Sequence, residues 1–197
     1  SKFNITPIFV FDGKPPSQKR NTLNSRRKVK FKIENRILEL KSSLDITEDK
    51  NDINTIQAKI KNLEKKLVYV DKNVIELTKS FLDLMGVSYL HADGEAEQLC
   101  AKLSRLDIVD GIISDDTDCI ACGSKITIRE FTNKNDFVVC YNLKEVLYKL
   151  DLNYSSFLDM CILLGTDYNS KIKGKSFKDI YGMIKEYDTI ENLIERG

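Results

Sequence analysis

Residues 112–119, IISDDTDC, place three aspartates within four positions, directly after a short apolar run. The run at 111–114 has the composition of a buried β-strand, and the acids begin where that strand would end. Like charges this close repel one another unless a positive group lies among them. The segment therefore indicates a fold in which a strand end delivers negative side chains to a site that holds a cation.

Strand-like and helix-like segments alternate along most of the chain. The composition and period of the sequence predict strands at 7–11, 86–90, 111–114, 125–131 and 137–141, with the last two forming a hairpin. They predict helices at 95–106, 142–150, 154–164, 176–186 and 189–195. This alternation is typical of an α/β fold with a mainly parallel β-sheet flanked by helices.

A long helical stretch interrupts the alternation at 18–85. The polar segment 44–52 predicts a break between two long helices. The second helix has apolar residues every three or four positions, which form one stripe: Ile53, Ile56, Ile60, Leu63 and Leu67. The pair is typical of a solvated helical hairpin.

Acidic residues follow the first three predicted strands. They are Asp12, then Glu95 and Glu97, then Asp116 and Asp118, and Asp167 follows an apolar helix. Carboxyl ends of parallel strands meet at one edge of a sheet, where ligands bind. Alone, each acid would be a helix cap or a turn residue. As a set they are the oxygen ligands that Mg²⁺ prefers, with Mn²⁺ as an alternative, and they suffice for two ions.

The chain separates its charges by segment although the net charge is only +1. Residues 14–36 contain nine basic side chains and one acid, whereas residues 91–120 contain eight acids and two basic side chains. Lys19 and Arg26 are seven positions apart, so they share one face if the segment is helical. A basic helix of this kind attracts a phosphate backbone, and the alternative is a solubilising surface.

Other features exclude some classes of protein. No apolar run approaches the roughly 18 residues of a membrane span, so we expect no membrane partner. Five cysteines without a regular spacing suit a reducing compartment. Cys119 and Cys122 have the spacing of half a zinc or redox site, but the one histidine is His91, which favours buried apolar roles for these thiols.

Four blocks of sequence resemble one family. They are VFDGKPP at 10–16, GEAEQLCA at 94–101, DDTDCIACGS at 115–124 and MCILLGTDY at 160–168. Their order and spacing are similar to those of the flap endonuclease family of structure-specific 5′ nucleases. The resemblance implies a PIN-like fold in a single nuclease domain over 1–197, with a helical arch at 17–70. It also implies a helix–two-turn–helix element for DNA binding at 156–190, with a K⁺ ion.

The resemblance also implies roles for individual residues. The metal ligands would be Asp12, Glu95, Glu97, Asp116, Asp118 and Asp167, whereas Asp115 would not be a ligand. The catalytic residues would be Asp118 with Lys19 and Arg26, the latter two neutralising charge on the scissile phosphate. The DNA-binding residues would be Lys14, Lys19, Arg20, Arg26, Arg27, Gly174 and Lys175.

The chain departs from the family's pattern in three places. The family has one more aspartate on a strand upstream of the first block. The resemblance therefore implies that this chain lacks the N-terminal strand region of the domain and that upstream residues would complete the metal site. The family's glycine-x-glycine turn is here Gly174-Lys175-Ser176, which removes one position of close backbone approach to phosphate. The family's sliding-clamp peptide would lie beyond Gly197.

The resulting hypothesis is a Mg²⁺-dependent 5′-flap endonuclease with 5′-3′ exonuclease activity that cleaves branched DNA with a single-stranded 5′ flap in replication and repair. Two alternatives stay open: a repair-type junction or bubble nuclease, and a DNA-structure binding module with an incomplete metal site. Such a protein would be intracellular, either in the nucleus of a eukaryote or in a viral replication compartment, and would bind a sliding clamp through another segment.

Overall fold

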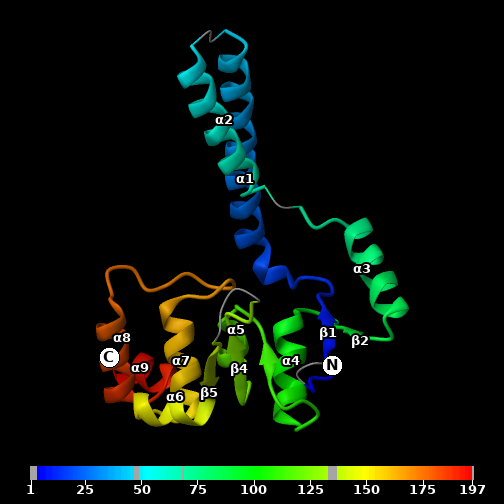
Figure 1. The fold of residues 1–197 in the computed structure, drawn as a ribbon. Coiled ribbons are helices and arrows are strands. Elements are labelled where there is room, and N and C mark those ends of the chain that lie inside the picture. Colours follow the sequence, from blue (N-terminus) through cyan, green and yellow to red (C-terminus); the bar gives the residue numbers. More distant parts are fainter. Residues whose placement is uncertain (1–3, 47–48, 68, 133–136, 197) are drawn as a thin grey trace. The chain divides into compact units, whose positions relative to one another are not determined.

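The computed structural model describes residues 4–46, 49–67, 69–132 and 137–196. Contacts divide the chain into two units, whose helices and strands are labelled in Figure 1. The sheet unit comprises Ser1–Gln18 and Ser88–Gly197, and the helical unit comprises Lys19–Val87. The expected arch at 17–70 falls almost entirely in the helical unit, which continues beyond it to Val87.

The strands of the sheet unit form two small sheets. Strand β1 (Ile8–Phe11) pairs in parallel with β2 (Ser88–His91). Strand β3 (Ile112–Ile113) pairs in parallel with β4 (Ile126–Arg129), which pairs antiparallel with β5 (Val139–Asn142). The α/β class and the hairpin are confirmed, and two of the three described pairings are parallel. The division into two sheets was not evident, because pairing partners depend on packing between distant segments.

Helix α4 (Ala96–Arg105) connects the two sheets and contacts both β1 and β3. Its packed face includes Ala101, which is fully buried and small enough for close approach. Ser104 is also buried, and its hydroxyl oxygen accepts a hydrogen bond from the backbone N–H of Lys125 at 3.0 Å. The burial of this polar side chain is thus compensated by a hydrogen bond.

A short helix that the sequence did not reveal, α5 (Asp118–Ala121), follows β3. Four helices then complete the sheet unit: α6 (Leu143–Leu150), α7 (Tyr154–Leu164), α8 (Phe177–Tyr187) and α9 (Ile190–Arg196). Their bounds agree with the predicted ranges to within a residue or two, because polar caps such as Asn142 and Asn153 mark the starts.

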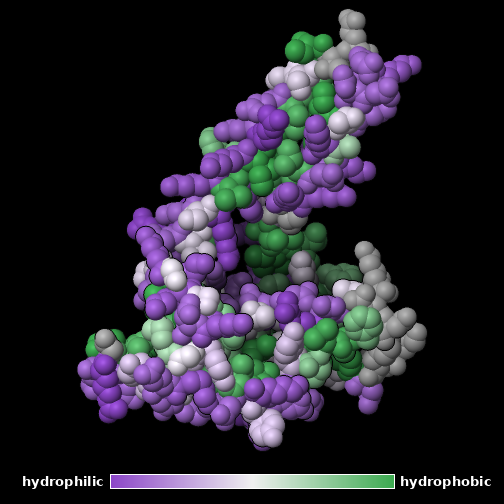
Figure 2. Space-filling model, turned by 90° about the vertical axis from the view of Figure 1, so that its left-hand side faces the viewer, coloured by the Kyte–Doolittle hydropathy of each residue, from purple (hydrophilic) through white to green (hydrophobic). Residues whose placement is uncertain are grey.

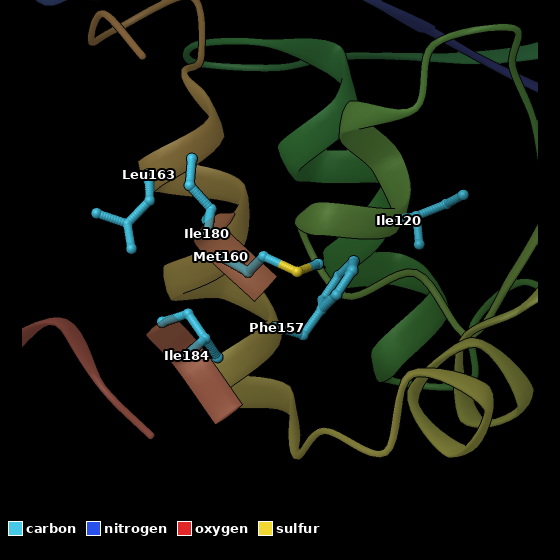
Figure 3. Packing of buried hydrophobic residues seen from close by; sticks show 6 residues of the cluster. All are labelled: Ile120, Phe157, Met160, Leu163, Ile180 and Ile184. Carbon is cyan, nitrogen blue, oxygen red and sulfur yellow. The ribbon is translucent and has the colours of Figure 1, made fainter. Parts of the chain in front are cut away.

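The main core lies between α5, α7 and α8 (Figure 3). Phe157 and Met160 of α7 lie between Ile120 on one side and Ile180 and Ile184 on the other. Helix periodicity places these apolar residues on facing surfaces, and their burial stabilises the C-terminal helices.

The helical unit contains the helices α1 (Arg20–Leu44), α2 (Lys50–Glu64) and α3 (Lys72–Leu84). A 3₁₀ turn (Ser17–Lys19) at the boundary between the two units precedes α1. The predicted break is confirmed at the end of α1, although residues 47–48 lie outside the described residues. A second break, before α3, was missed. Asp71 caps α3 by accepting the backbone N–H of Val74 at 2.9 Å, and this cap was the signal for the break.

Helices α1 and α2 form a hairpin whose seam consists of Ile37, Leu40 and Ile60. Most of the predicted stripe packs against this seam, namely Ile56, Leu63 and Leu67 with Ile60 itself, whereas Ile53 is not part of the cluster. Figure 2 shows hydrophilic side chains over most of the visible hairpin surface and a strip of apolar side chains along it. None of the described helices is long and apolar enough to cross a membrane.

We expect Ile184→Ala to lower the free energy of unfolding by about 2–5 kcal/mol, because it leaves a cavity in the main core. Ile184 is 1% exposed, whereas Ile194 of α9 is 77% exposed. The matched control Ile194→Ala should therefore change stability by less than about 0.5 kcal/mol. Urea unfolding measures both variants, and equal midpoints would contradict this description of the core.

Candidate active site

The end of β1 lies directly against the segment between β2 and α4. The backbone N–H of Gly13 donates to the carbonyl oxygen of Gly94 at 2.7 Å, and that of Ala92 donates to the carbonyl oxygen of Phe11 at 3.0 Å. A Cβ atom on Gly13 would lie 2.0 Å from the carbonyl oxygen of Ala92. Only glycine fits here, so the glycine after Asp12 is what lets this strand end approach α4.

Asp12 binds the start of α4 through a hydrogen bond. Its Oδ1 accepts the backbone N–H of Ala96, the first residue of the helix, at 2.8 Å. The first N–H groups of a helix have no partner within the helix, and their positive dipole end favours a carboxylate. Glu95 is the N-cap residue and Glu97 lies in the first turn, so this bond brings Asp12 beside both glutamates.

Glu97 experiences the charge of three other acids. Partial burial raises its pKa above the usual range, and Asp12, Asp116 and Glu95 raise that pKa further by repulsion. A hydrogen bond with the backbone acts in the opposite direction. Acids from the ends of β1, β2 and β3 thus gather around the first turn of α4.

Asp116 and Asp118 are held by local hydrogen bonds. The backbone N–H of Asp116 donates to Oγ of Ser114 at 3.1 Å, and that of Asp118 donates to Oδ1 of Asp116 at 2.9 Å. Burial is the largest cause of the raised pKa of the Cys122 thiol, and the charges of Asp118, Glu97 and Glu95 raise that pKa further. Asp118 therefore lies near the same thiol as the two glutamates.

Asp115 has a different contact from its neighbours. Its Oδ1 accepts the backbone N–H of Glu130 at 2.8 Å. Glu130 has a left-handed backbone with a φ of 57°, so this bond holds a turn at the end of β4. Asp115 is not among the residues that raise the pKa of Glu97.

Asp167 lies in the turn after α7. The next residue, Tyr168, contacts one of the gathered acids. The hydroxyl of Tyr168 donates to Oε2 of Glu95, and the backbone N–H of Tyr168 donates to the hydroxyl of Thr166 at 3.1 Å. Tyr168 was not among the predicted site residues. Its only signal was its place in the MCILLGTDY block, because an exposed tyrosine has no characteristic partner in sequence.

The gathered acids do not form a coordination shell. Within residues 4–46, 49–67, 69–132 and 137–196, no three His, Cys, Asp or Glu side chains are close enough together to hold a metal ion. The donor chemistry nevertheless fits Mg²⁺ or Mn²⁺, because all the gathered side chains offer hard carboxylate oxygens. The repulsion at Glu97 is the physical signal that a cation would be favoured here.

The cysteines near the acids have the properties of protonated thiols. Burial is the main cause that raises the pKa of Cys119 to about 12 and that of Cys161 to about 11, and the charges of nearby acids contribute to both values. Burial also raises the pKa of Cys122, the other member of the pair. Thiolates are the form that binds zinc, so the raised pKa values of Cys119 and Cys122 favour the apolar interpretation of the pair.

The predicted basic residues lie on several elements. Lys19 is the residue before α1, and Arg20, Arg26 and Arg27 lie on α1 with exposed side chains. The helix predicted for this basic segment is therefore present. Lys14 directly follows Gly13, after the end of β1 in the sheet unit.

Gly174 and Lys175 are exposed in the turn before α8, and Gly174 has a φ of 76° that suits glycine. Ser176 and Asp179 form a capping box at the start of α8, so a carboxylate already accepts the Ser176 N–H at 2.7 Å.

Two family models match this chain. The XPG N-terminal domain matches residues 1–33 and the XPG I-region matches residues 86–167. Flap endonuclease 1 of Brugia malayi is 37% identical over 196 residues, an alignment that covers 97% of this chain and 48% of the relative.

Two solved structures are also similar. The catalytic core of Rad2 in complex with DNA substrate has a TM-score of 0.70 and 28% identity, over 98% of this chain and 51% of that one. Flap endonuclease-1 from Methanococcus jannaschii has a TM-score of 0.65 and 27% identity, over 98% of this chain and 61% of that one.

The chain thus spans about half the length of the curated relatives it matches. The six acids predicted from the sequence as metal ligands all fall inside the two matched regions. Together with the shared fold and the sequence identity, this shows that the chain belongs to the flap endonuclease family.

Proposed function

We propose that this chain is part of a Mg²⁺-dependent, structure-specific 5′-flap endonuclease with 5′-3′ exonuclease activity, which cuts branched DNA in replication and repair. The observation that carries the proposal is the gathering of Asp12, Glu95 and Asp116 around Glu97 in a member of this family. Such a concentration of negative charge has a cost that a structural role does not explain, and divalent cations offset it.

The residues that would hold two divalent ions are the six acids predicted from the sequence: Asp12, Glu95, Glu97, Asp116, Asp118 and Asp167. When bound, such ions lower the pKa of water to make a nucleophile and stabilise the departing oxygen of a phosphodiester. The chain's own contribution is orientation. Asp12 is held by the N–H of Ala96, Glu95 by the hydroxyl of Tyr168, and Asp116 by the N–H of Asp118.

The basic residues would bind the DNA. We propose that Lys19 and Arg26 neutralise charge on the scissile phosphate and that Lys14, Arg20 and Arg27 attract the backbone, since helix α1 exposes a run of cations. Duplex DNA and a K⁺ ion would bind at the turn with Gly174 and Lys175. The negative charge of Asp179 at this turn attracts a cation such as K⁺, whereas it repels the phosphate groups of DNA.

A junction or bubble nuclease of the same superfamily is the second candidate. The Rad2 core and the archaeal flap endonuclease are similar to this chain to about the same degree, so fold similarity does not identify which DNA structure is cut. Comparing cleavage of flap, bubble and four-way-junction oligonucleotides would distinguish them.

In the full-length protein that contains this chain, Asp118→Ala should reduce Mg²⁺-dependent cleavage of a labelled 5′-flap oligonucleotide by about 100-fold or more. Metal ions supply several kcal/mol of transition-state stabilisation, and each 1.4 kcal/mol is about tenfold in rate. Flap binding measured by fluorescence anisotropy should change little.

The matched control is Asp110→Ala, which removes an exposed acid from the loop before β3. It should cut at the wild-type rate. Wild-type cleavage by Asp118→Ala would contradict the proposed mechanism, and flap binding without any cleavage by the wild-type protein would favour the binding-module alternative.

Glu97→Gln should raise the melting temperature of the metal-free protein at pH 7. Because the folded-state pKa of Glu97 is raised, its contribution to stability is present at low pH and is lost as the pH rises through that pKa. The two proteins should therefore be equally stable below about pH 4, where the carboxyl is protonated in both states. Differential scanning calorimetry across this pH range measures the effect.

Mg²⁺ should reverse the order of stability at pH 7. Metal that binds only the folded state raises the melting temperature of the wild type, and it should do so less for Glu97→Gln. Glu195→Gln, which changes an exposed glutamate on α9, should behave as the wild type does. Equal Mg²⁺ shifts in all three proteins would contradict a metal role for Glu97.

A further inference from the structure

Helix α5 carries one of the proposed metal ligands but is too short to be stable by itself. It has four residues, begins at Asp118 and has no side-chain hydrogen bond at its N-cap residue Thr117. A single helical turn is unfavourable in water, because its nucleation fixes several dihedral angles for one hydrogen bond. Contacts from outside the helix must therefore hold Asp118 in place.

Two side chains from other helices bind the C-terminal end of α5. The guanidinium of Arg105 donates to the carbonyl oxygen of Cys122, and the hydroxyl of Tyr154 donates to the carbonyl oxygen of Ala121 at 2.9 Å. The last carbonyl groups of a helix have no partner within it. A positive charge also suits the negative end of the helix dipole.

The space around Gly123 is consistent with the same arrangement. A Cβ atom on this glycine would lie 2.9 Å from the hydroxyl oxygen of Tyr154 and 3.1 Å from Nη1 of Arg105. Gly123 also has a φ of 90°, which other residues rarely adopt. The two side chains thus lie directly against Gly123, two residues after the end of α5, and a side chain at this position would have to displace them.

These contacts connect α5 to the two helices that flank it. Arg105 is the last residue of α4, whose other end carries Glu95 and Glu97, and Tyr154 is the first residue of α7. The backbone N–H of Asp118 in turn donates to Oδ1 of Asp116 at 2.9 Å. A displacement of α5 would therefore move both aspartates relative to the glutamates.

We propose that Arg105 and Tyr154 are positioning residues that fix Asp116 and Asp118 for metal binding by holding the C-terminal end of α5. Neither contacts the DNA in this role, and each acts through the backbone of α5. The inference rests on the proposed function for the identity of the ligand, but the positioning itself is measurable without cleavage.

The test uses Arg105→Met, Arg105→Lys and Tyr154→Phe in the full-length protein. The controls are Lys102→Met, which removes an exposed charge one turn earlier on α4, and Tyr148→Phe, which removes a hydroxyl from a tyrosine that is 87% exposed. Mn²⁺ binding by calorimetry, amide hydrogen exchange of the metal-free protein, and cleavage as a function of Mg²⁺ concentration are compared.

Hydrogen exchange has direct reporters here. The backbone N–H groups of Cys122, Gly123 and Ser124 donate to the carbonyl oxygens of Asp118, Ile120 and Cys119, respectively. Arg105→Met and Tyr154→Phe should speed their exchange by roughly tenfold, the factor that one lost hydrogen bond represents.

The same two variants should weaken Mn²⁺ binding by about 10–100-fold, as the loss of groups that orient metal ligands does. They should raise the Mg²⁺ concentration needed for half-maximal cleavage more than they lower the maximal rate, and flap affinity without metal should not change. Arg105→Lys, which keeps the charge, should restore part of the Mn²⁺ affinity.

Wild-type Mn²⁺ affinity in both Arg105→Met and Tyr154→Phe would overturn the proposal, whether or not exchange becomes faster. A wild-type protein that binds Mn²⁺ but cuts no flap would refute the proposed function, while Mn²⁺ affinity would still test the positioning roles. A wild-type protein that binds no Mn²⁺ would overturn both.

Discussion

Repulsion among carboxylates at the first turn of α4 is the constraint around which the rest of the sheet unit is arranged. Partial burial is the main cause of the raised pKa of Glu97, and the nearby charges of Asp12, Asp116 and Glu95 raise that pKa further. The chain offsets part of the repulsion with donors, since the N–H of Ala96 binds Asp12 and the hydroxyl of Tyr168 binds Glu95. Such an arrangement indicates a site selected for binding rather than for stability.

Small residues make this crowding geometrically attainable. Gly13 permits contact between the end of β1 and the segment before α4, Ala101 allows α4 to pack closely, and Gly123 leaves room for Arg105 and Tyr154. A side chain at either glycine would displace backbone or hydrogen-bond donors. The site therefore depends on these small residues as well as on the acids.

The positions of strands and helices were largely predictable, because hydrophobic period and polar caps act locally. The apolar run at Ile112 and the capping residue Asn153 are examples of signals that need no distant partner. Helix α5 and the break before α3 were missed: the first is stabilised by contacts from other helices, and the second is marked only by a single capping aspartate. The distribution of strands over two sheets likewise depends on which edges meet in space.

The type and order of the acids along the chain already predicted a divalent-cation site, and the blocks shared with the family were present in the sequence. Which acids are neighbours became evident from the folded chain, as did the role of Asp115 in holding a turn. The contacts of Tyr168 with Glu95 and of Arg105 and Tyr154 with the end of α5 were likewise visible in the fold alone. The physical reason is the range of the interactions. Propensity and capping act within a few residues, whereas repulsion at Glu97 and the support of α5 arise between segments that only folding brings together.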